Sequence, residues 1–201
     1  EQIKKWRRQL HQIPELGLQE YQTSNYLKKE LIEMGYDPIS ILDTGILVYI
    51  DHHQDKTVAF RSDMDGLKIS EQTNCNFKSK HDGYMHACGH DGHMAALLAL
   101  AKRLKESDES FDFNILLIFQ PAEEGVRGAK SICESGFLDD VDYIFAAHIM
   151  PRVKDYDLYF GMNESFATTK LDVIYHGVST HAAESPQFGK NALLSAANCI
   201  I

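Results

Sequence analysis

The stretch MHACGHDGH, residues 85–93, combines one cysteine with three histidines and runs directly into an apolar segment, residues 94–101. Cys88 and His90 are separated by one glycine, so in locally extended backbone their side chains point to the same side. Both could therefore bind one ion or a close pair of ions. A thiolate and imidazoles favour Zn²⁺, although added carboxylates would also admit manganese or cobalt. The stretch therefore predicts a metal site just before a buried helix.

Segments with strand and helix patterns alternate on both sides of this stretch. Short apolar runs predict strands at residues 45–50, 57–60, 113–119 and 143–147. Helical spacing predicts an opening helix that stops before Pro14 and further helices at residues 23–34, 94–101 and 129–135. Several strands are too apolar to have a solvent-exposed face. The sequence therefore predicts an α/β fold with a mostly parallel sheet covered by helices on both sides.

The character of the sequence changes after residue 165. Residues 170–175 alternate like a half-exposed strand, residues 177–190 form a loop rich in small residues, and residues 191–201 begin a helix. We expect a first domain over residues 1–166 and the start of a second domain over residues 167–201. The chain starts without methionine and stops in apolar sequence, so we expect it to be part of a longer protein.

Composition and charge argue against several classes of partner. The chain is 44% apolar and 24% charged, as in ordinary globular proteins, and its net charge of −9 argues against a nucleic-acid partner. No run reaches the roughly 18 apolar residues of a membrane span. The four cysteines are widely scattered with no paired spacing, which indicates a reducing compartment, and we infer a cytoplasmic protein.

Potential ligands and acids follow the predicted strands. In a mostly parallel sheet, ligands bind beyond the carboxyl ends of the strands, and Asp65, Glu123, Glu124 and His148 each lie just past such an end. Glu123 and Glu124 are adjacent, so their side chains leave the backbone in different directions. One can bind metal while the other takes a proton from metal-activated water. We assign Glu123 as the base and Glu124 as the ligand, although their spacing alone does not choose between them.

Other residues near this edge have two possible roles. His148 precedes Met150-Pro151, a rigid turn that would fix it at the sheet edge, and a buried packing histidine is the alternative. Asp63 and Asp65 could orient a ligand histidine, because metal-bound imidazoles usually give their second N–H to an acceptor, and we favour Asp65. His93 either binds metal or closes the first turn of the helix.

His181 lies in the small-residue loop of residues 179–183. It either contacts a substrate or an oxyanion, or it is an ordinary loop residue. Five further histidines have no constellation of potential ligands around them, and we treat them as surface or packing residues: His11, His52, His53, His81 and His176.

Taken together, five segments resemble the M20 metallopeptidase family, in its amidohydrolase branch. That branch includes hippurate hydrolase, N-acetyldiaminopimelate deacetylase and the plant auxin-conjugate hydrolases. The matching segments run through nearly the whole chain in the expected order: RQLHQIPELG (residues 8–17), RSDMDGL (61–67), MHACGHDGH (85–93), QPAEEG (120–125) and AHIMP (147–151).

The resemblance implies a site with two divalent metal ions, held by Cys88, His90, Glu124 and His148, with Glu123 as the base. Zinc is the expected metal, with manganese or cobalt as alternatives. The resemblance also implies a metal-dependent amidohydrolase that cleaves small N-acyl amino acids into a carboxylate and a free amino acid. A dipeptidase or aminopeptidase of the same family and a catalytically silent metal-binding module are the alternatives. The spare carboxylate of Glu123 argues against the silent module.

The resemblance further implies a catalytic domain interrupted by a smaller α+β lid domain, which commonly makes the homodimer. A lid histidine of one subunit then reaches the active site of the other, and His181 is the candidate for that role. The family's final metal-binding histidine lies near the end of a much longer chain, and this sequence stops before that region. Gly66 and Lys68 replace the alanine and proline of many relatives, which leaves the substrate open.

Overall fold

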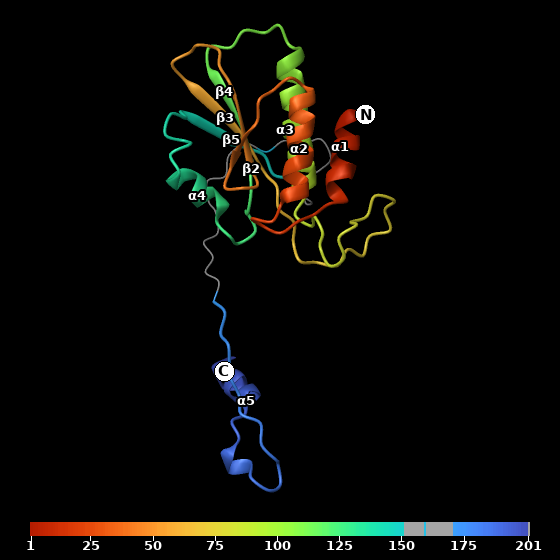
Figure 1. Cartoon of the computed structure of the whole chain (residues 1–201), viewed down its shortest axis with the longest axis vertical. Coiled ribbons are helices and arrows are strands. Elements are labelled where there is room, and N and C mark those ends of the chain that lie inside the picture. The colour runs from red at the N-terminus through yellow and green to blue at the C-terminus, as the bar shows by residue number, and fades with distance from the viewer. Residues whose placement is uncertain (151–158, 160–170, 201) are drawn as a thin grey trace. The chain divides into compact units, whose positions relative to one another are not determined.

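Residues 1–150, 159 and 171–200 are described by the computed structural model (Figure 1). The chain divides into two units, residues 1–153 and residues 154–201. The expected domain boundary between residues 166 and 167 lies outside the described residues, and so does Pro151. Each unit is therefore considered by itself.

The larger unit is built on a five-stranded sheet in the order β1-β2-β4-β3-β5. Strand β3 pairs in parallel with β4 and β5, whereas β2 pairs antiparallel with β1 and β4. Strand β2 therefore runs against the other strands, and the predicted mostly parallel sheet is confirmed. The strands are β1 (Ile39–Ile41), β2 (Gly45–Ile50), β3 (Thr57–Asp63), β4 (Asn114–Gln120) and β5 (Tyr143–Ala146).

Strand β4 forms the centre of the sheet, and each of its residues is buried. Its parallel register with β3 places Asp63 opposite Gln120, so the two strands end side by side. The loops that leave these strands, residues 64–67 and 121–125, therefore start from neighbouring points. This register brings residues that are far apart in sequence to one edge of the sheet.

Helices cover the two faces of the sheet unequally. Helices α1 (Gln2–His11), α2 (Tyr21–Glu33) and α3 (His90–Glu106) lie together on one face (Figure 1). On the other face, Ile132 of the short helix α4 (Gly128–Glu134) joins the second group of buried apolar residues. Covering on both sides is thus confirmed. None of the described helices has both the length and the apolar character that a membrane crossing requires.

The side chains of β4 alternate between the two faces as the strand period requires. Leu117 and Phe119 pack into the core beneath α1, α2 and α3, whereas Leu116 and Ile118 join the smaller apolar cluster that includes Ile132. Burial on both sides explains why this strand is a continuous apolar run in the sequence.

Several elements differ from the sequence prediction, and β3 is one of them, because it continues to Asp63, three residues past its predicted end. Strand β1 was not predicted, because three residues give too short a pattern to recognise. Helix α3 begins at His90, four residues before the predicted start, because Gly89 adopts a left-handed conformation with φ of 88° and turns the chain into the helix. Strand β5 is exposed along its length, since among the described residues it pairs only with β3.

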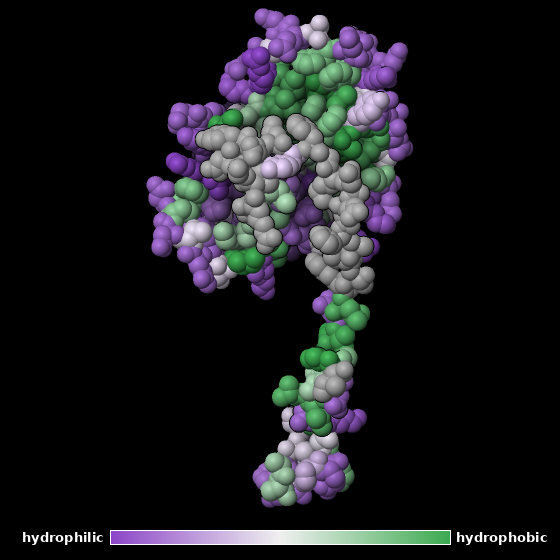
Figure 2. Space-filling view, turned by 180° about the vertical axis from the view of Figure 1, so that it is seen from behind, coloured by the Kyte–Doolittle hydropathy of each residue, from purple (hydrophilic) through white to green (hydrophobic). Residues whose placement is uncertain are grey.

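The smaller unit contains helix α5 (Ala192–Ile200), a short 3-10 helix at Pro186–Phe188 and a bridge between Val178 and Lys190. The predicted helix at its end is confirmed. The strand predicted at residues 170–175 is wrong over its described part, because residues 171–175 pair with no other described strand. Figure 2 shows apolar surface, in green, on this unit, whose described residues include none that is buried.

Shortening a side chain of the larger unit should destabilise it only where that side chain is buried. Leu31 and Ile32 are neighbours on α2, but Leu31 has no exposed surface and Ile32 is 59% exposed. Leu31→Ala should lower the free energy of unfolding by about 2–5 kcal/mol through the cavity that it leaves. Ile32→Ala is the matched control and should change it by less than about 0.5 kcal/mol. Urea unfolding monitored by circular dichroism measures the free energy of unfolding of both variants. Equal losses of stability would contradict the placement of Leu31 in the core and of Ile32 at the surface.

Candidate metal centre

Three chain segments meet at the carboxyl ends of β3 and β4. They are the loop after β3, the turn before α3 and the loop after β4. A fourth segment, the residues after β5, packs against the turn, because the Ile149 side chain lies 3.6 Å from the position that a side chain on Gly89 would take. The left-handed Gly89 thus gives the sharp entry into α3, and Gly92 leaves space for the segment that carries His148, because a Cβ there would lie 2.5 Å from Ile149 Cδ1.

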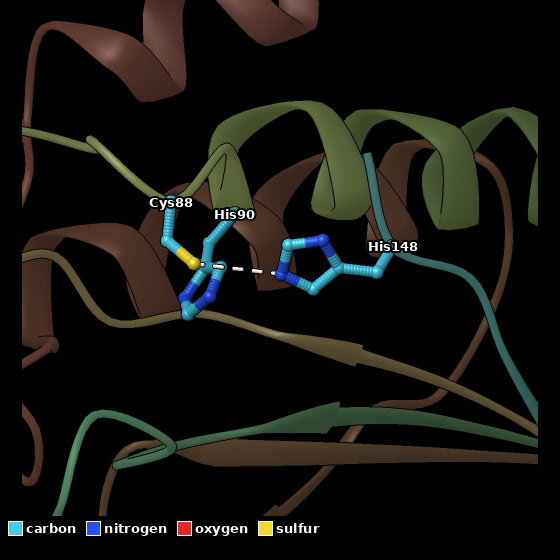
Figure 3. A group of neighbouring side chains, drawn as sticks. All are labelled: Cys88, His90 and His148. Carbon is cyan, nitrogen blue, oxygen red and sulfur yellow. Dashed lines mark hydrogen bonds between the residues drawn. The ribbon is translucent and has the colours of Figure 1, made fainter. Parts of the chain in front are cut away.

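The structure brings together the five residues predicted to hold metal or act as base. Potential ligand atoms of Cys88, His90 and His148 lie within 4.8 Å of one another, and so do those of His90, Glu123 and Glu124. Figure 3 shows the Cys88 and His148 side chains meeting beside His90, and the Cys88 Sγ to His148 Nε2 distance is 3.4 Å. Because both groups share His90, its imidazole is the centre of the site.

The chemistry of these atoms fits a divalent cation. The Nδ1 of His90 hydrogen-bonds the backbone carbonyl of Asp65 at 2.8 Å, which leaves Nε2 as the free ring nitrogen. This Nε2 and the Oε1 of Glu124 are both buried, have no hydrogen-bond partner among the described residues, and lie 3.9 Å apart. Buried polar atoms are normally paired, so an unpaired nitrogen next to an unpaired carboxylate oxygen is the arrangement expected where an ion can bind.

Asp65 organises the site differently from the prediction. We expected its side chain to orient a ligand histidine, but its shorter contact with His90 is made by the backbone carbonyl. Its carboxylate accepts the N–H of Glu123 at 3.0 Å and the N–H of Glu124 at 2.8 Å. Although burial opposes it, the bonds from His90 and from these two N–H groups lower the pKa of Asp65. Asp65 is therefore a positioning residue for the glutamate pair.

Asp63 and His93 hold the segment that carries His148. The Nδ1 of His93 donates to Asp63 at 2.7 Å, and its Nε2 accepts the backbone N–H of Ile149 at 2.9 Å. Both ring nitrogens are therefore used, so His93 acts as a link rather than as a free ligand. Although burial opposes it, the His93 bond and the charges of His90 and Arg61 lower the pKa of Asp63 to about 2.

The thiol of Cys88 keeps its proton in the absence of metal. Burial, followed by the negative charges of Glu124 and Glu123, raises the pKa of Cys88 to about 11. A cation must bind the thiolate, so its binding at neutral pH releases this proton.

Two buried carboxylates next to the site were missed from the sequence. Glu20 is fully buried and accepts the N–H of Ala122 at 2.8 Å and the hydroxyl of Thr44 at 2.7 Å, so it holds the loop that leads to the glutamate pair. No local pattern marks it. Asp91 directly follows the candidate ligand His90, and this place in the sequence was the signal that could have marked it as part of the surroundings of the site.

The treatment of His11 as an isolated surface or packing residue was incomplete. It is buried, as a packing residue would be, but it bonds the carboxylate of Asp91 at 2.8 Å and that of Glu71 at 3.3 Å. Both carboxylates come from distant parts of the sequence, so no local pattern could show this constellation.

His181 belongs to the smaller unit, and only its contacts within that unit are considered. Its Nδ1 accepts the backbone N–H of Ala183 at 3.3 Å and that of Glu184 at 3.1 Å, which assigns the ring proton to Nε2. The residue is exposed. Its role at the metal site stays a prediction.

The fold and the site together define the class: an α/β domain of the metallopeptidase type, with cysteine, histidine and glutamate side chains gathered beyond the strand ends. The chain belongs to peptidase family M20/M25/M40, whose sequence profile matches residues 59–197.

Relatives with named functions support this assignment. The chain is 43% identical to an N-acetyldiaminopimelate deacetylase from Streptococcus uberis, over 94% of this chain and 52% of the relative. It is 36% identical to an indole-3-acetyl-aspartic acid hydrolase from Enterobacter agglomerans, over 100% of this chain and 57% of the relative. The chain thus spans about half the length of the curated relatives that it matches.

A solved structure has the same fold. It is a dinuclear metal-binding peptidase of the M20 family from Bacillus subtilis, with a TM-score of 0.71 and 39% identity, covering 75% of this chain and 43% of that chain. The predicted family and fold are both confirmed.

Asp65→Asn should weaken metal binding by about 10–100-fold, because the amide can accept only one of the two N–H groups that the carboxylate holds. Asp43→Asn is the matched control, since Asp43 is exposed. Competition titration of Zn²⁺ against a chromophoric chelator measures both affinities. Unchanged affinity in Asp65→Asn would show that the glutamate pair does not need this support.

His86 should make the metal-free protein less stable in mild acid. Burial lowers its pKa from 6.5 to about 4, so the unfolded chain takes up this proton at a higher pH than the folded chain. The stability contributed by neutral His86 is complete above about pH 6.5 and is lost as the pH falls towards 4. From pH 7 to pH 5 the loss is about 2 kcal/mol.

Urea unfolding of the wild type and of His86→Gln, at both pH values and with a chelator present, isolates this effect. The variant lacks the titrating group, so its stability should fall by about 2 kcal/mol less than that of the wild type. The same fall in both proteins would contradict the assignment.

Proposed function

We propose that the protein is a metal-dependent amidohydrolase that cleaves the amide bond of small N-acyl amino acids. The observation that carries the proposal is the pair of unpartnered buried atoms, His90 Nε2 and Glu124 Oε1, with the carboxylate of Glu123 beside them. A purely structural metal site needs no additional carboxylate. A hydrolytic site needs one as a general base.

In this proposal Cys88, His90, Glu124 and His148 hold two divalent ions, with zinc as the expected metal and manganese or cobalt as alternatives. When bound, the ions would polarise the substrate carbonyl and lower the pKa of water towards about 7. Two metals fit the dinuclear site of the Bacillus subtilis relative. The mixed set of sulfur, nitrogen and oxygen ligands fits an open, catalytic site.

Glu123 is the proposed general base. It is exposed, its backbone is fixed by the bond to Asp65, and none of the described residues hydrogen-bonds its carboxylate. It can therefore take the proton from the attacking water and deliver it to the nitrogen that leaves. Glu124, which is more buried, faces His90 instead.

The relatives support the substrate class. By their names, the Streptococcus uberis relative removes an acetyl group from N-acetyldiaminopimelate, and the Enterobacter agglomerans relative hydrolyses a conjugate of aspartic acid. Both substrates are amino acids acylated on nitrogen. We propose the same bond for this protein, without choosing the acyl group or the amino acid.

The smaller unit is proposed to be the start of a lid that also makes the homodimer. His181, with its proton assigned to Nε2, would donate to the substrate in the site of the opposite subunit. The exposed apolar residues of this unit fit a surface that another part of the protein covers. Four free cysteines fit a cytoplasmic location.

Glu123→Gln should lower turnover by at least about 100-fold, because general base catalysis typically contributes that much or more. Metal content should stay at the wild-type level, because the base is not a ligand. Release of free amino acid from N-acetyl amino acids, N-benzoyl amino acids and dipeptides gives the rate, and elemental analysis gives the metal. Glu134→Gln makes the same change at an exposed position on α4 and should leave both unchanged.

The panel also separates the alternatives. Turnover of acyl amino acids that disappears in Glu123→Gln supports the proposal. A preference for dipeptides would replace it with a peptidase function. A metal-loaded full-length protein without turnover on any substrate would favour a silent metal-binding module.

A further inference from the structure

A second cluster of potential ligands lies outside the five residues described above. It is formed by His11 at the end of α1 and by Glu71 and Cys75 in the loop between β3 and α3. A bridge between Leu67 and Met85 closes the base of this loop. His11 and Glu71 are buried, and Cys75 is half-buried with a free thiol.

The three side chains meet at one oxygen. The Oε1 of Glu71 lies 3.3 Å from the Nε2 of His11 and 3.6 Å from the Sγ of Cys75. All three ligand atoms lie within 4.8 Å of one another. In a tetrahedral zinc site with ordinary bond lengths, a nitrogen and an oxygen ligand are about 3.3 Å apart, and a sulfur and an oxygen about 3.5 Å apart. The two separations from Glu71 Oε1 therefore match those of a metal site.

We propose that His11 Nε2, the Glu71 carboxylate and Cys75 Sγ form a separate binding site for a divalent transition metal of the zinc or cobalt class. One imidazole, one thiolate and one carboxylate are the ligands that suit these ions. Three protein ligands leave a fourth position for water or for a ligand that enters from the adjacent cavity.

The surroundings of His11 are those of a metal ligand. On the side of Glu71 and Cys75 an ion would replace the Nε2 proton of His11, and behind the ring Asp91 accepts the Nδ1 proton at 2.8 Å. Arg7 donates to the same carboxylate at 3.1 Å and fixes it. A carboxylate behind the imidazole is the usual support of a metal-bound histidine.

Glu71 is also held by its own loop, because its Oε1 accepts a hydrogen bond from the hydroxyl of Thr73. The 3.3 Å between His11 Nε2 and Glu71 Oε1 is longer than the roughly 2.7–2.9 Å of a charge-assisted N–H···O bond. The other oxygen of Glu71 is held by the backbone N–H of Ser79 at 2.6 Å. The carboxylate is therefore oriented by the loop with one oxygen towards the histidine and the thiol.

An independent feature also points to a ligand here. A cavity of about 380 Å³ opens beside the cluster and is lined by His11, Cys75 and His86, among others. His86 is 3% exposed, and within the described part of the chain neither of its ring nitrogens has a hydrogen-bond partner. The cavity also reaches Cys88, so an ion bound at the cluster would lie on its wall and stiffen the loop beside the main metal centre.

Cobalt binding in the intact protein tests the proposal, because a thiolate bound to Co²⁺ gives a charge-transfer absorption band. Cys88→Ser first removes the thiol of the main centre. In this background we expect a remaining thiolate–cobalt band that saturates at one equivalent. Adding Cys75→Ser should abolish the band. Adding Cys133→Ser, which changes an exposed free cysteine, should leave it intact.

Glu71→Gln, again in the Cys88→Ser background, should weaken the cobalt affinity at least tenfold. Far-ultraviolet circular dichroism confirms that each variant is folded. Two results would overturn the proposal: no band in Cys88→Ser, or a band that persists after Cys75→Ser is added. Elemental analysis of the metal-loaded wild type should find one metal ion more than in Cys75→Ser, and equal contents would also overturn it.

Discussion

The hydrogen bonds of Asp65 are the constraint on which the rest of the metal centre depends. Its carboxylate binds the backbone N–H groups of Glu123 and Glu124, and its carbonyl binds the imidazole of His90. Asp65, a single residue in the loop after β3, therefore fixes the loop after β4 and the first turn of α3 relative to each other. The residue is 1% exposed, so water does not compete for these bonds. A buried carboxylate is stable there because two N–H groups satisfy it.

Fully paired and unpaired polar groups lie side by side at this edge of the sheet. The buried pair of Asp63 and His93 is satisfied at both ends, whereas no described residue hydrogen-bonds His90 Nε2 or Glu124 Oε1. An unpaired buried polar group costs about 1–3 kcal/mol, and the fold carries this cost where a ligand supplies the missing partner. The satisfied pair holds the chain around the site, and the unsatisfied pair faces the position proposed for an ion.

Local patterns in the sequence predicted much of the architecture. The strand predicted at residues 45–50 is β2 without any shift, and the apolar run at residues 113–119 is the central strand β4 within one residue. Such predictions succeed because the period of apolar residues depends on local backbone geometry. The meeting of Cys88, Glu124 and His148 could be anticipated for a related reason, because the loops after neighbouring parallel strands emerge at the same edge of a sheet.

The sequence by itself thus determined the α/β class, most of the elements and the residue types of the metal centre. Only the tertiary structure decided how they act. The reversed direction of β2 and the exposure of β5 depend on which strands lie beside them, and that is not a local property. Likewise, Asp65 supports His90 through its carbonyl, and His11 meets Glu71 across 60 residues of chain. These contacts exist only when distant segments pack together, so no pattern of neighbouring residues encodes them.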